Sequence, residues 1–202
     1  MEHPPVIDLA FPLTGEQIPL DHGYLLFSAL ARSLEVDDDH WLHEHKGLGI
    51  HPIRGRYAGP GRLALGERAR LTLRLPEAEI PKWLGLAGRE LQLAEDTLRI
   101  GIPQPRTLVP APNLYAHRVT TRNGQDEARF DAEIACQLAT LNVRGRPHRG
   151  PRRTFRVRGK RIVAYTLLVT ELTAEESIRL QEGGLGGRRK LGCGIFLPWR
   201  SK

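Results

Sequence analysis

The feature that most constrains the fold is an order of strand and helix patterns that occurs twice along the 202 residues. In the first half, alternating apolar residues over 6–11 predict a strand, and the apolar spacing from Phe27 to Leu34 predicts a helix that Asp21 can cap. Residues 59–66, which begin and end with glycine, are expected to form a long irregular loop. The other elements of this half are predicted as strands over 48–53, 70–75 and 91–102, and a short helix from Pro76 through 83–86.

The second half repeats this order. Residues 114–121 predict a strand and residues 126–141 predict an amphipathic helix. Thr173 and Glu176 have the spacing of a capping box, which begins a helix that ends at Gly183-Gly184. The remaining elements are a basic hairpin that turns at Gly159-Lys160, its return strand over 162–172 and a last strand over 196–198.

Strand–helix–strand–strand–helix–strand, found twice, predicts an α+β fold of tandem ferredoxin-like (βαββαβ) domains with a C-terminal glycine-rich loop. The boundaries follow from a proline-rich stretch that is typical of a linker. We expect an N-terminal domain over 1–102, a linker over 103–112 and a C-terminal domain over 113–202.

Cysteine usage and hydropathy bear on the compartment. The chain has two cysteines, Cys136 and Cys193, and no pattern of a secretory leader. No apolar run approaches the roughly 18 residues that a membrane-spanning helix needs. These features predict a reducing, cytoplasmic setting.

The net charge of +7 comes from one segment. Residues 144–161 hold nine Lys and Arg residues and no acid, while the rest of the chain has 21 basic against 23 acidic residues. A local cationic segment favours nucleic-acid binding, and a solvated basic loop is the alternative. Apolar residues interleave with the cations and predict a strand with Arg153, Arg156 and Arg158 on one cationic face. The candidate RNA-binding residues here are Arg144, Arg146, Arg149, Arg152, Arg153, Arg156, Arg158, Lys160 and Arg161.

A glycine-rich segment lies near the C-terminus. Over residues 184–194, two Gly-x-Gly pairs enclose five residues, of which three are cationic. Glycines permit close backbone approach, and successive N–H groups with adjacent cations form an anion-binding concavity, so a phosphate-bearing ligand is expected. The segment is not a nucleotide P-loop, because Lys190 is followed by leucine. The candidate phosphate contacts are Gly184, Gly186, Arg188, Arg189, Lys190, Gly192 and Gly194.

Together with the blocks LDHGYLLFSAL (20–30) and GIHPIRG (49–55), this segment resembles a known family. The chain is similar over essentially its whole length to the CRISPR repeat-processing endoribonucleases of the repeat-associated mysterious protein (RAMP) superfamily, in particular the myxobacterial-type (Myxan) subfamily. The resemblance implies cleavage of CRISPR precursor RNA within each repeat, without a metal or cofactor, to leave a 2′,3′-cyclic phosphate and a 5′-hydroxyl. It implies CRISPR repeat RNA as the partner and, in relatives that keep their product, subunits of an effector complex.

The catalytic candidates follow from this resemblance and from histidine chemistry. Metal-free RNA cleavage requires a general base, a general acid and a cation near the phosphate, and the ordinary pKa of histidine suits proton transfer at neutral pH. His43 is the first candidate, because the family's histidine follows the first helix in a similar context, and Lys46 is the candidate cation. His51 is the nearest rival, with His22 and Tyr24 at the head of the first helix after it.

Two other interpretations remain. His40, His43 and His45 could bind a metal together with His51, although their spacing matches no established metal signature. The chain could also be a non-catalytic RNA-binding subunit of the same superfamily, which would not need the histidines or Lys46.

Overall fold

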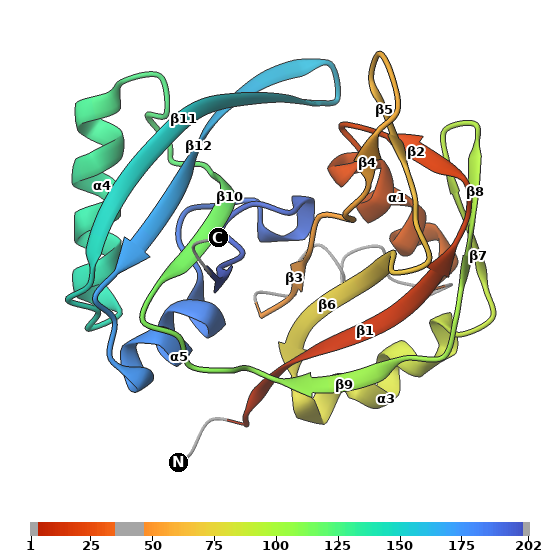
Figure 1. Ribbon diagram of the computed structural model, residues 1–202, viewed down its shortest axis with the longest axis horizontal. Coiled ribbons are helices and arrows are strands. Elements are labelled where there is room, and N and C mark those ends of the chain that lie inside the picture. Colours follow the sequence, from red (N-terminus) through yellow and green to blue (C-terminus); the bar gives the residue numbers. More distant parts are fainter. Residues whose placement is uncertain (1–3, 35–46, 200–202) are drawn as a thin grey trace. The chain divides into compact units, whose positions relative to one another are not determined.

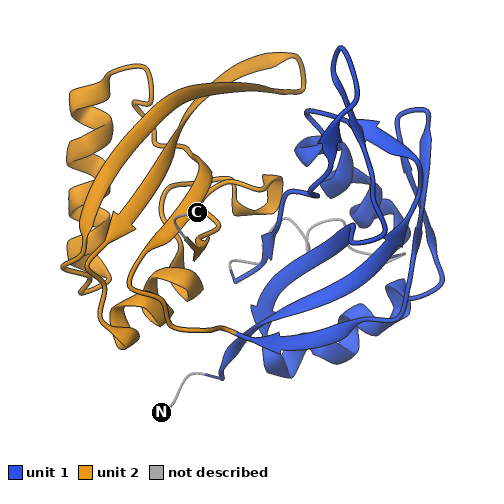
Figure 2. Ribbon diagram, viewed as in Figure 1, with its two compact units in different colours: residues 1–107 blue, residues 108–202 orange. Residues whose placement is uncertain are grey.

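The computed structural model describes residues 4–34 and 47–199. The chain forms two compact units, residues 1–107 and residues 108–202 (Figure 2). Within the described residues, no helix is both long and apolar enough to cross a bilayer.

The first unit is built around the long strand β1 (Figure 1). β6 pairs antiparallel with one edge of β1 and with β3 beyond it, whereas β9 pairs with the other edge. Chain order β1–α1–β3–β6–α3–β9 and spatial order β3-β6-β1-β9 are consistent with a ferredoxin-like unit. The bounds of these elements are β1 Val6–Thr14, α1 Gly23–Ser33, β3 Gly49–Ile50, β6 Arg70–Pro76, α3 Ile80–Trp83 and β9 Gln104–Thr107, with 3-10 turns Glu77–Glu79 and Leu84–Leu86 flanking α3.

This sheet has one apolar face. Ile7, Leu9 and Phe11 on β1 alternate with less apolar residues and are buried, as are the alternate positions Leu73 and Leu75 on β6. Because successive side chains of a strand point to opposite faces, Asp8 and its partner Arg74 lie on the other face. That second face holds the candidate site described below.

Two additions to this unit differ from the prediction. Residues 91–102 do not supply the fourth strand, because Ala94 adopts a positive φ and the segment folds back as a hairpin beside the end of β1. The expected irregular loop 59–66 contains a strand that belongs to a small second sheet. The added elements are β2 Gln17–Pro19, β4 Arg56–Tyr57, β5 Arg62–Ala64, β7 Glu90–Leu93 and β8 Asp96–Ile100.

The fourth strand of the first unit lies instead inside the predicted linker. β9 pairs with β1 from Ile7 to Ala10, although it contains Pro105. Proline cannot donate a backbone hydrogen bond, but it is tolerated on an edge strand whose other side is unpaired. The division between the units, after Thr107, therefore falls within 103–112, and only part of that stretch connects the units.

The second unit is a four-stranded antiparallel sheet in the order β11-β12-β10-β13. Chain order β10–α4–β11–β12–α5–β13 is again consistent with a ferredoxin-like unit. Phe130 of α4 and Leu180 of α5 share one apolar cluster with Tyr165 and Leu167 of β12, so both helices pack on the same face of the sheet. The bounds are β10 Leu114–Val119, α4 Glu127–Thr140, β11 Arg146–Val157, β12 Lys160–Thr170, α5 Ala174–Gly183, a 3-10 turn Arg189–Leu191 and β13 Leu197–Pro198.

The predicted capping box is confirmed. The Thr173 hydroxyl accepts the backbone N–H of Glu176, and the Glu176 carboxylate accepts the backbone N–H of Thr173. At α4 the side chain of Asp126 caps the first turn. At α1 the cap prediction was wrong, because the N-cap residue is His22, whose side chain does not cap the helix.

Candidate functional site

Three neighbouring strands of the first unit bring Asp8, His51 and Arg74 together. Arg74 donates from Nε to Asp8 Oδ1 at 2.8 Å and from Nη2 to Oδ2 at 2.9 Å. His51 Nε2 lies 3.2 Å from Asp8 Oδ1. His51 follows β3 directly, and its backbone N–H donates to the carbonyl of Thr72 on β6, which fixes the start of the GIHPIRG block against the sheet.

The electrostatics of this cluster favour an ionised Asp8 and a neutral His51. Burial raises the pKa of Asp8, but hydrogen bonds from His51 and Arg74 outweigh it and hold that pKa well below its ordinary value. For His51, burial lowers the pKa, Asp8 opposes this, and the charges of Arg74 and Arg54 add to the lowering. A neutral imidazole beside a fixed carboxylate is able to accept a proton near neutral pH.

His22 has a different environment. Its side chain is buried, its Nδ1 is 3.0 Å from the carbonyl of Pro19, and its Nε2 accepts the backbone N–H of Ile53 at 3.0 Å. Nδ1 thus bonds to the end of β2, whereas Nε2 joins the start of α1 to the segment after His51. This geometry argues against proton transfer by His22. Tyr24, in the first turn of α1, is half-buried.

His43 and Lys46 lie outside the described residues, as do His40 and His45. The first catalytic candidate and the candidate cation therefore stay predictions. Within the described parts of the chain, no group of three or more His, Cys, Asp or Glu side chains is arranged to hold a metal ion. Since three of the four clustered histidines are not described, this does not test the predicted alternative of a metal site there.

In the second unit, the two Gly-x-Gly pairs pack against each other and against the end of β10. A Cβ on Gly194 would collide with the carbonyl oxygen of Leu185, and a Cβ on Gly186 with that of Thr120. The backbone N–H groups of every glycine in this segment have partners within the protein, which argues against a concavity built from the glycine N–H groups, whereas a concavity over residues 188–190 stays a prediction. The N–H groups bonded internally are those of Gly184, Gly186, Gly187, Leu191, Gly192, Cys193 and Gly194.

The cations of this segment differ in exposure. Arg188 is exposed at a left-handed backbone position with φ of 63°, and within the described residues its side chain makes no ion pair with an acid. Arg189 is half-buried and donates to the carbonyl of Gly183 at 2.9 Å. Burial lowers the pKa of Lys190. Cys193 is buried against Phe155 and Ala164, as expected of a small packed side chain.

The basic segment forms a long hairpin of β11 and β12 (Figure 1), with a tight turn at Arg158-Gly159, where both residues have positive φ. The prediction of one cationic face is wrong, because residues three apart on a regular strand point to opposite faces. Arg153 shares a face with Phe155, Arg156 lies on the other face, and Arg158 lies in the turn.

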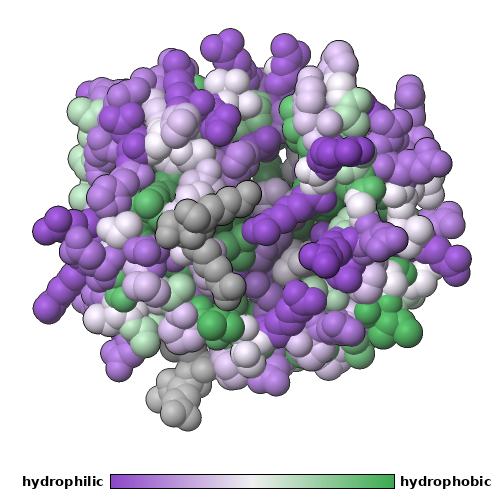
Figure 3. Space-filling model, viewed as in Figure 1, coloured by the Kyte–Doolittle hydropathy of each residue, from purple (hydrophilic) through white to green (hydrophobic). Residues whose placement is uncertain are grey.

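Acidic partners divide the cations of this hairpin into two sets. Arg149 contacts Glu127 at 2.8 Å and Asp131 at 2.9 Å on α4, and Arg146 lies 3.3 Å from Glu171. The second set is exposed and, within the described residues, pairs with no acid: Arg144, Arg152, Arg153, Lys160 and Arg161. Hydrophilic residues also cover much of the face of the molecule drawn in Figure 3, with hydrophobic residues in smaller patches between them.

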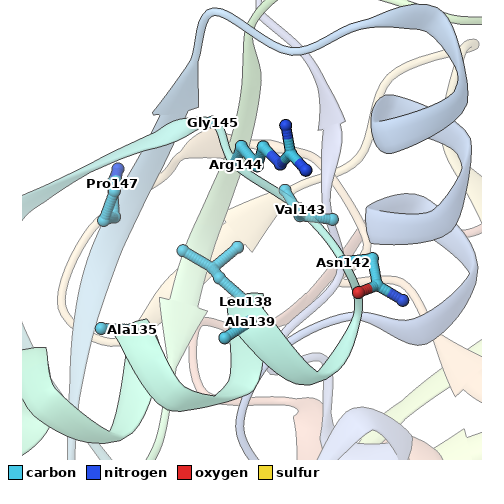
Figure 4. A pocket seen from close by; sticks show the side chains of 8 residues that line it. All are labelled: Ala135, Leu138, Ala139, Asn142, Val143, Arg144, Gly145 and Pro147. Atoms are coloured by element: carbon cyan, nitrogen blue, oxygen red, sulfur yellow. The ribbon is translucent and has the colours of Figure 1, made fainter.

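A separate hollow of about 380 Å³ lies in the second unit between the C-terminal turns of α4 and the start of β11 (Figure 4). Ala135, Leu138 and Val143 form its apolar lining, and Arg144 is its one charged lining residue. The hollow thus lacks the grouped cations that a phosphate site requires.

Comparison with known proteins decides the family. The family model described as Cas6 CRISPR matches residues 7–201. The chain belongs to the Cas6 family. The CRISPR-associated endonuclease Cas6 of Myxococcus xanthus (strain DK1622) is 41% identical to this Cas6 chain over 192 residues, which span 95% of this chain and 81% of that protein.

Solved structures show that the mixed α+β fold is shared with a Cas6 protein and with a RAMP protein. The structure described as "CRISPR associated protein Cas6" has a TM-score of 0.72 at 13% identity and covers 96% of this chain and 100% of that chain. The structure described as "An RAMP protein binding different RNA substrates" has a TM-score of 0.67 at 13% identity, with 94% and 98% covered. At such low identities, the likeness establishes the fold alone.

Proposed function

We propose that this Cas6 chain is an endoribonuclease that cleaves CRISPR precursor RNA within its repeats to give mature guide RNAs. The observation that carries the proposal is the family match over residues 7–201, together with 41% identity to a CRISPR-associated endonuclease. The myxobacterial origin of that relative supports the Myxan subfamily that the LDHGY and GIHPIRG blocks resemble.

The proposed chemistry is attack of a ribose 2′-hydroxyl on the adjacent phosphorus, without a metal. His43 or His51 takes the proton of the 2′-hydroxyl, and Lys46 stabilises the charge that develops on the phosphate. The products carry a 2′,3′-cyclic phosphate and a 5′-hydroxyl. Support for His51 comes from its neutral, carboxylate-held ring, and His43 remains the candidate from the family context.

We propose that the repeat RNA is held by its phosphates. The positive charge for this comes from Arg188 and from the exposed hairpin cations that pair with no acid in the described part of the chain. A-form RNA has a deep, narrow major groove, so a repeat stem would be bound by its shape and backbone rather than by its base edges.

The test uses the purified protein and its own repeat RNA in excess EDTA. We expect cleavage at one position in each repeat, and no cleavage when the nucleotide 5′ of the cut carries 2′-deoxyribose. Mapping of the ends should give the cyclic phosphate and the 5′-hydroxyl. Loss of activity on chelation, restored by zinc or manganese, would favour a metal site in the histidine cluster. Tight binding without any cleavage would favour the scaffold interpretation.

A further inference from the structure

The carboxylate of Asp8 is held from two sides. Arg74, whose side chain is fully buried, fixes both oxygens in a bidentate pair, and His51 Nε2 contacts one of them. The three residues come from β1, from β6 beside it and from the position directly after β3. Asp8 lies 43 residues from His51 and 66 from Arg74 in sequence, so the fold alone creates this contact.

The contact determines which nitrogen of His51 carries the proton. An ionised carboxylate has no hydrogen to donate, so Nε2 must bear the N–H that bridges to Asp8 Oδ1. In the neutral ring, Nδ1 then carries the lone pair. Within the described residues, Nδ1 of His51 makes no hydrogen bond. The nitrogen that is able to accept a proton is therefore the one to which the described residues supply no hydrogen bond.

We propose that Asp8 is a positioning residue for RNA cleavage, holding His51 as the Nε2–H tautomer so that Nδ1 takes the proton of the 2′-hydroxyl. This inference rests on the proposed function, with His51 as the general base. The proton passes to Nδ1, the 2′-oxygen bonds to phosphorus, the bond from phosphorus to the 5′-oxygen breaks, and a separate acid protonates that oxygen. Asp8 stays ionised and stabilises the imidazolium that forms, as a triad carboxylate does.

Among the described residues, three charged groups act on His51, and they give the proposal a pH signature. Asp8 on β1 favours the protonated ring. Arg74 on β6 and Arg54, three residues after His51, disfavour it. Removing the charge of Asp8 should lower the pKa of His51 and move the acid limb of kcat to lower pH. Removing the exposed Arg54 charge should raise that pKa and move the limb to higher pH. If Asp8 were purely structural, its removal would leave the acid limb at the pH of the wild type.

The first experiment reads the tautomer without any RNA. Two-bond proton–nitrogen NMR correlations of the His51 ring should show a protonated Nε2 and an unprotonated Nδ1 in the wild type. In Asp8→Asn the preference should be lost, because the amide can donate as well as accept. A wild-type ring protonated at Nδ1, or a tautomer unchanged by Asp8→Asn, would overturn the proposal.

The second experiment measures single-turnover cleavage of repeat RNA across pH. Asp8→Asn should lower the plateau rate by about 10²-fold or more, with the acid limb moved to lower pH, while RNA affinity stays near that of the wild type. Arg54→Gln should move the acid limb the other way. If the wild type cleaves and Asp8→Asn has the same rate and pH profile, only the positioning role fails. If the wild type does not cleave, the proposed function fails, and the NMR result still stands.

Asp8→Asn leaves the buried Arg74 without a counter-charge, so two further variants separate folding from chemistry. Asp8→Asn/Arg74→Gln removes both charges together, and it should show the same loss of rate and the same tautomer change. Asp96→Asn is the matched control, because it breaks another Asp–Arg pair of the same unit, with Arg62, and neither residue is among those that shift the pKa of His51. Asp96→Asn should leave the rate per folded molecule and the pH profile unchanged, and an equal effect of both single variants would contradict a specific role for Asp8.

Discussion

Gly194 lies so close to Leu185 that a Cβ at position 194 would meet the carbonyl oxygen of Leu185. Leu185 is the middle residue of the first Gly-x-Gly pair, and Gly194 is the last residue of the second. Glycine at position 194 is therefore required by the contact between the two pairs. Packing against protein backbone and a positive φ of 66° at Gly194 are enough to require glycine here, without the close approach of an RNA phosphate. We therefore propose that the segment contacts RNA through its exposed cation, Arg188.

From this packing we predict that Gly194→Ala and Gly186→Ala destabilise the second unit by about 2 kcal/mol or more, through a strained φ and a collision with backbone. Chemical denaturation of each variant measures the effect. Gly187→Ala is the control, because its φ is not positive and its Cβ would meet nothing nearer than Thr120 Oγ1 at 3.8 Å. Stable Gly194→Ala and Gly186→Ala proteins that lose only RNA affinity would restore the prediction of a direct RNA contact.

A second prediction concerns His22. His22→Ala removes the acceptor of the buried Ile53 N–H and should cost about 1–3 kcal/mol of folding free energy. Cleavage per folded molecule should stay close to that of the wild type, since both ring nitrogens are already used inside the protein. Denaturation curves and single-turnover rates measured on the same preparation check both parts. A stable variant with cleavage reduced by 10²-fold would return His22 to the catalytic candidates.

The third prediction assigns the proton transfer. His43→Ala should remove most cleavage, by about 10²–10⁴-fold, while binding stays within a few-fold of the wild type. One neutral side chain adds little to an affinity that phosphate contacts dominate. Parallel assays of His51→Ala decide between the two residues. Normal cleavage by His43→Ala with loss in His51→Ala would give the role to His51, and normal cleavage by both would favour a scaffold.

Local patterns predicted the elements well, and contacts distant in sequence account for what was missed. The capping box of Thr173 and Glu176 lies within four residues, so spacing alone revealed it. β9 was taken for linker because its partner, β1, is almost a hundred residues away and prolines mask its pairing. The role of Asp8 had no local signal, since a single acid in an alternating strand becomes significant only when Arg74 and His51 fold onto it.

The error in the basic hairpin could have been avoided from the sequence. Arg153 and Arg156 are an odd number of positions apart, and a period of two places them on opposite faces. Which cations are held by acids could not be foreseen in this way. The partners of Arg149 lie on α4, and only the packing of that helix on the sheet brings them within reach.

The last prediction uses this division of the hairpin cations. Each neutralised phosphate contributes roughly −0.9 to the slope of log affinity against log salt on a duplex and about −0.7 on a single strand. Arg152→Gln/Arg153→Gln should therefore flatten that slope by about 1.4 to 1.8 units if both side chains contact phosphates. Arg149→Gln is the matched control. Because Glu127 and Asp131 balance the charge of Arg149 in the wild type, this variant should change the slope little. Single-turnover cleavage at saturating protein should remain near that of the wild type in both variants, because the proton-transfer candidates lie elsewhere. An unchanged slope in the double variant would mean that these arginines form a solvated surface and that the RNA lies against other residues.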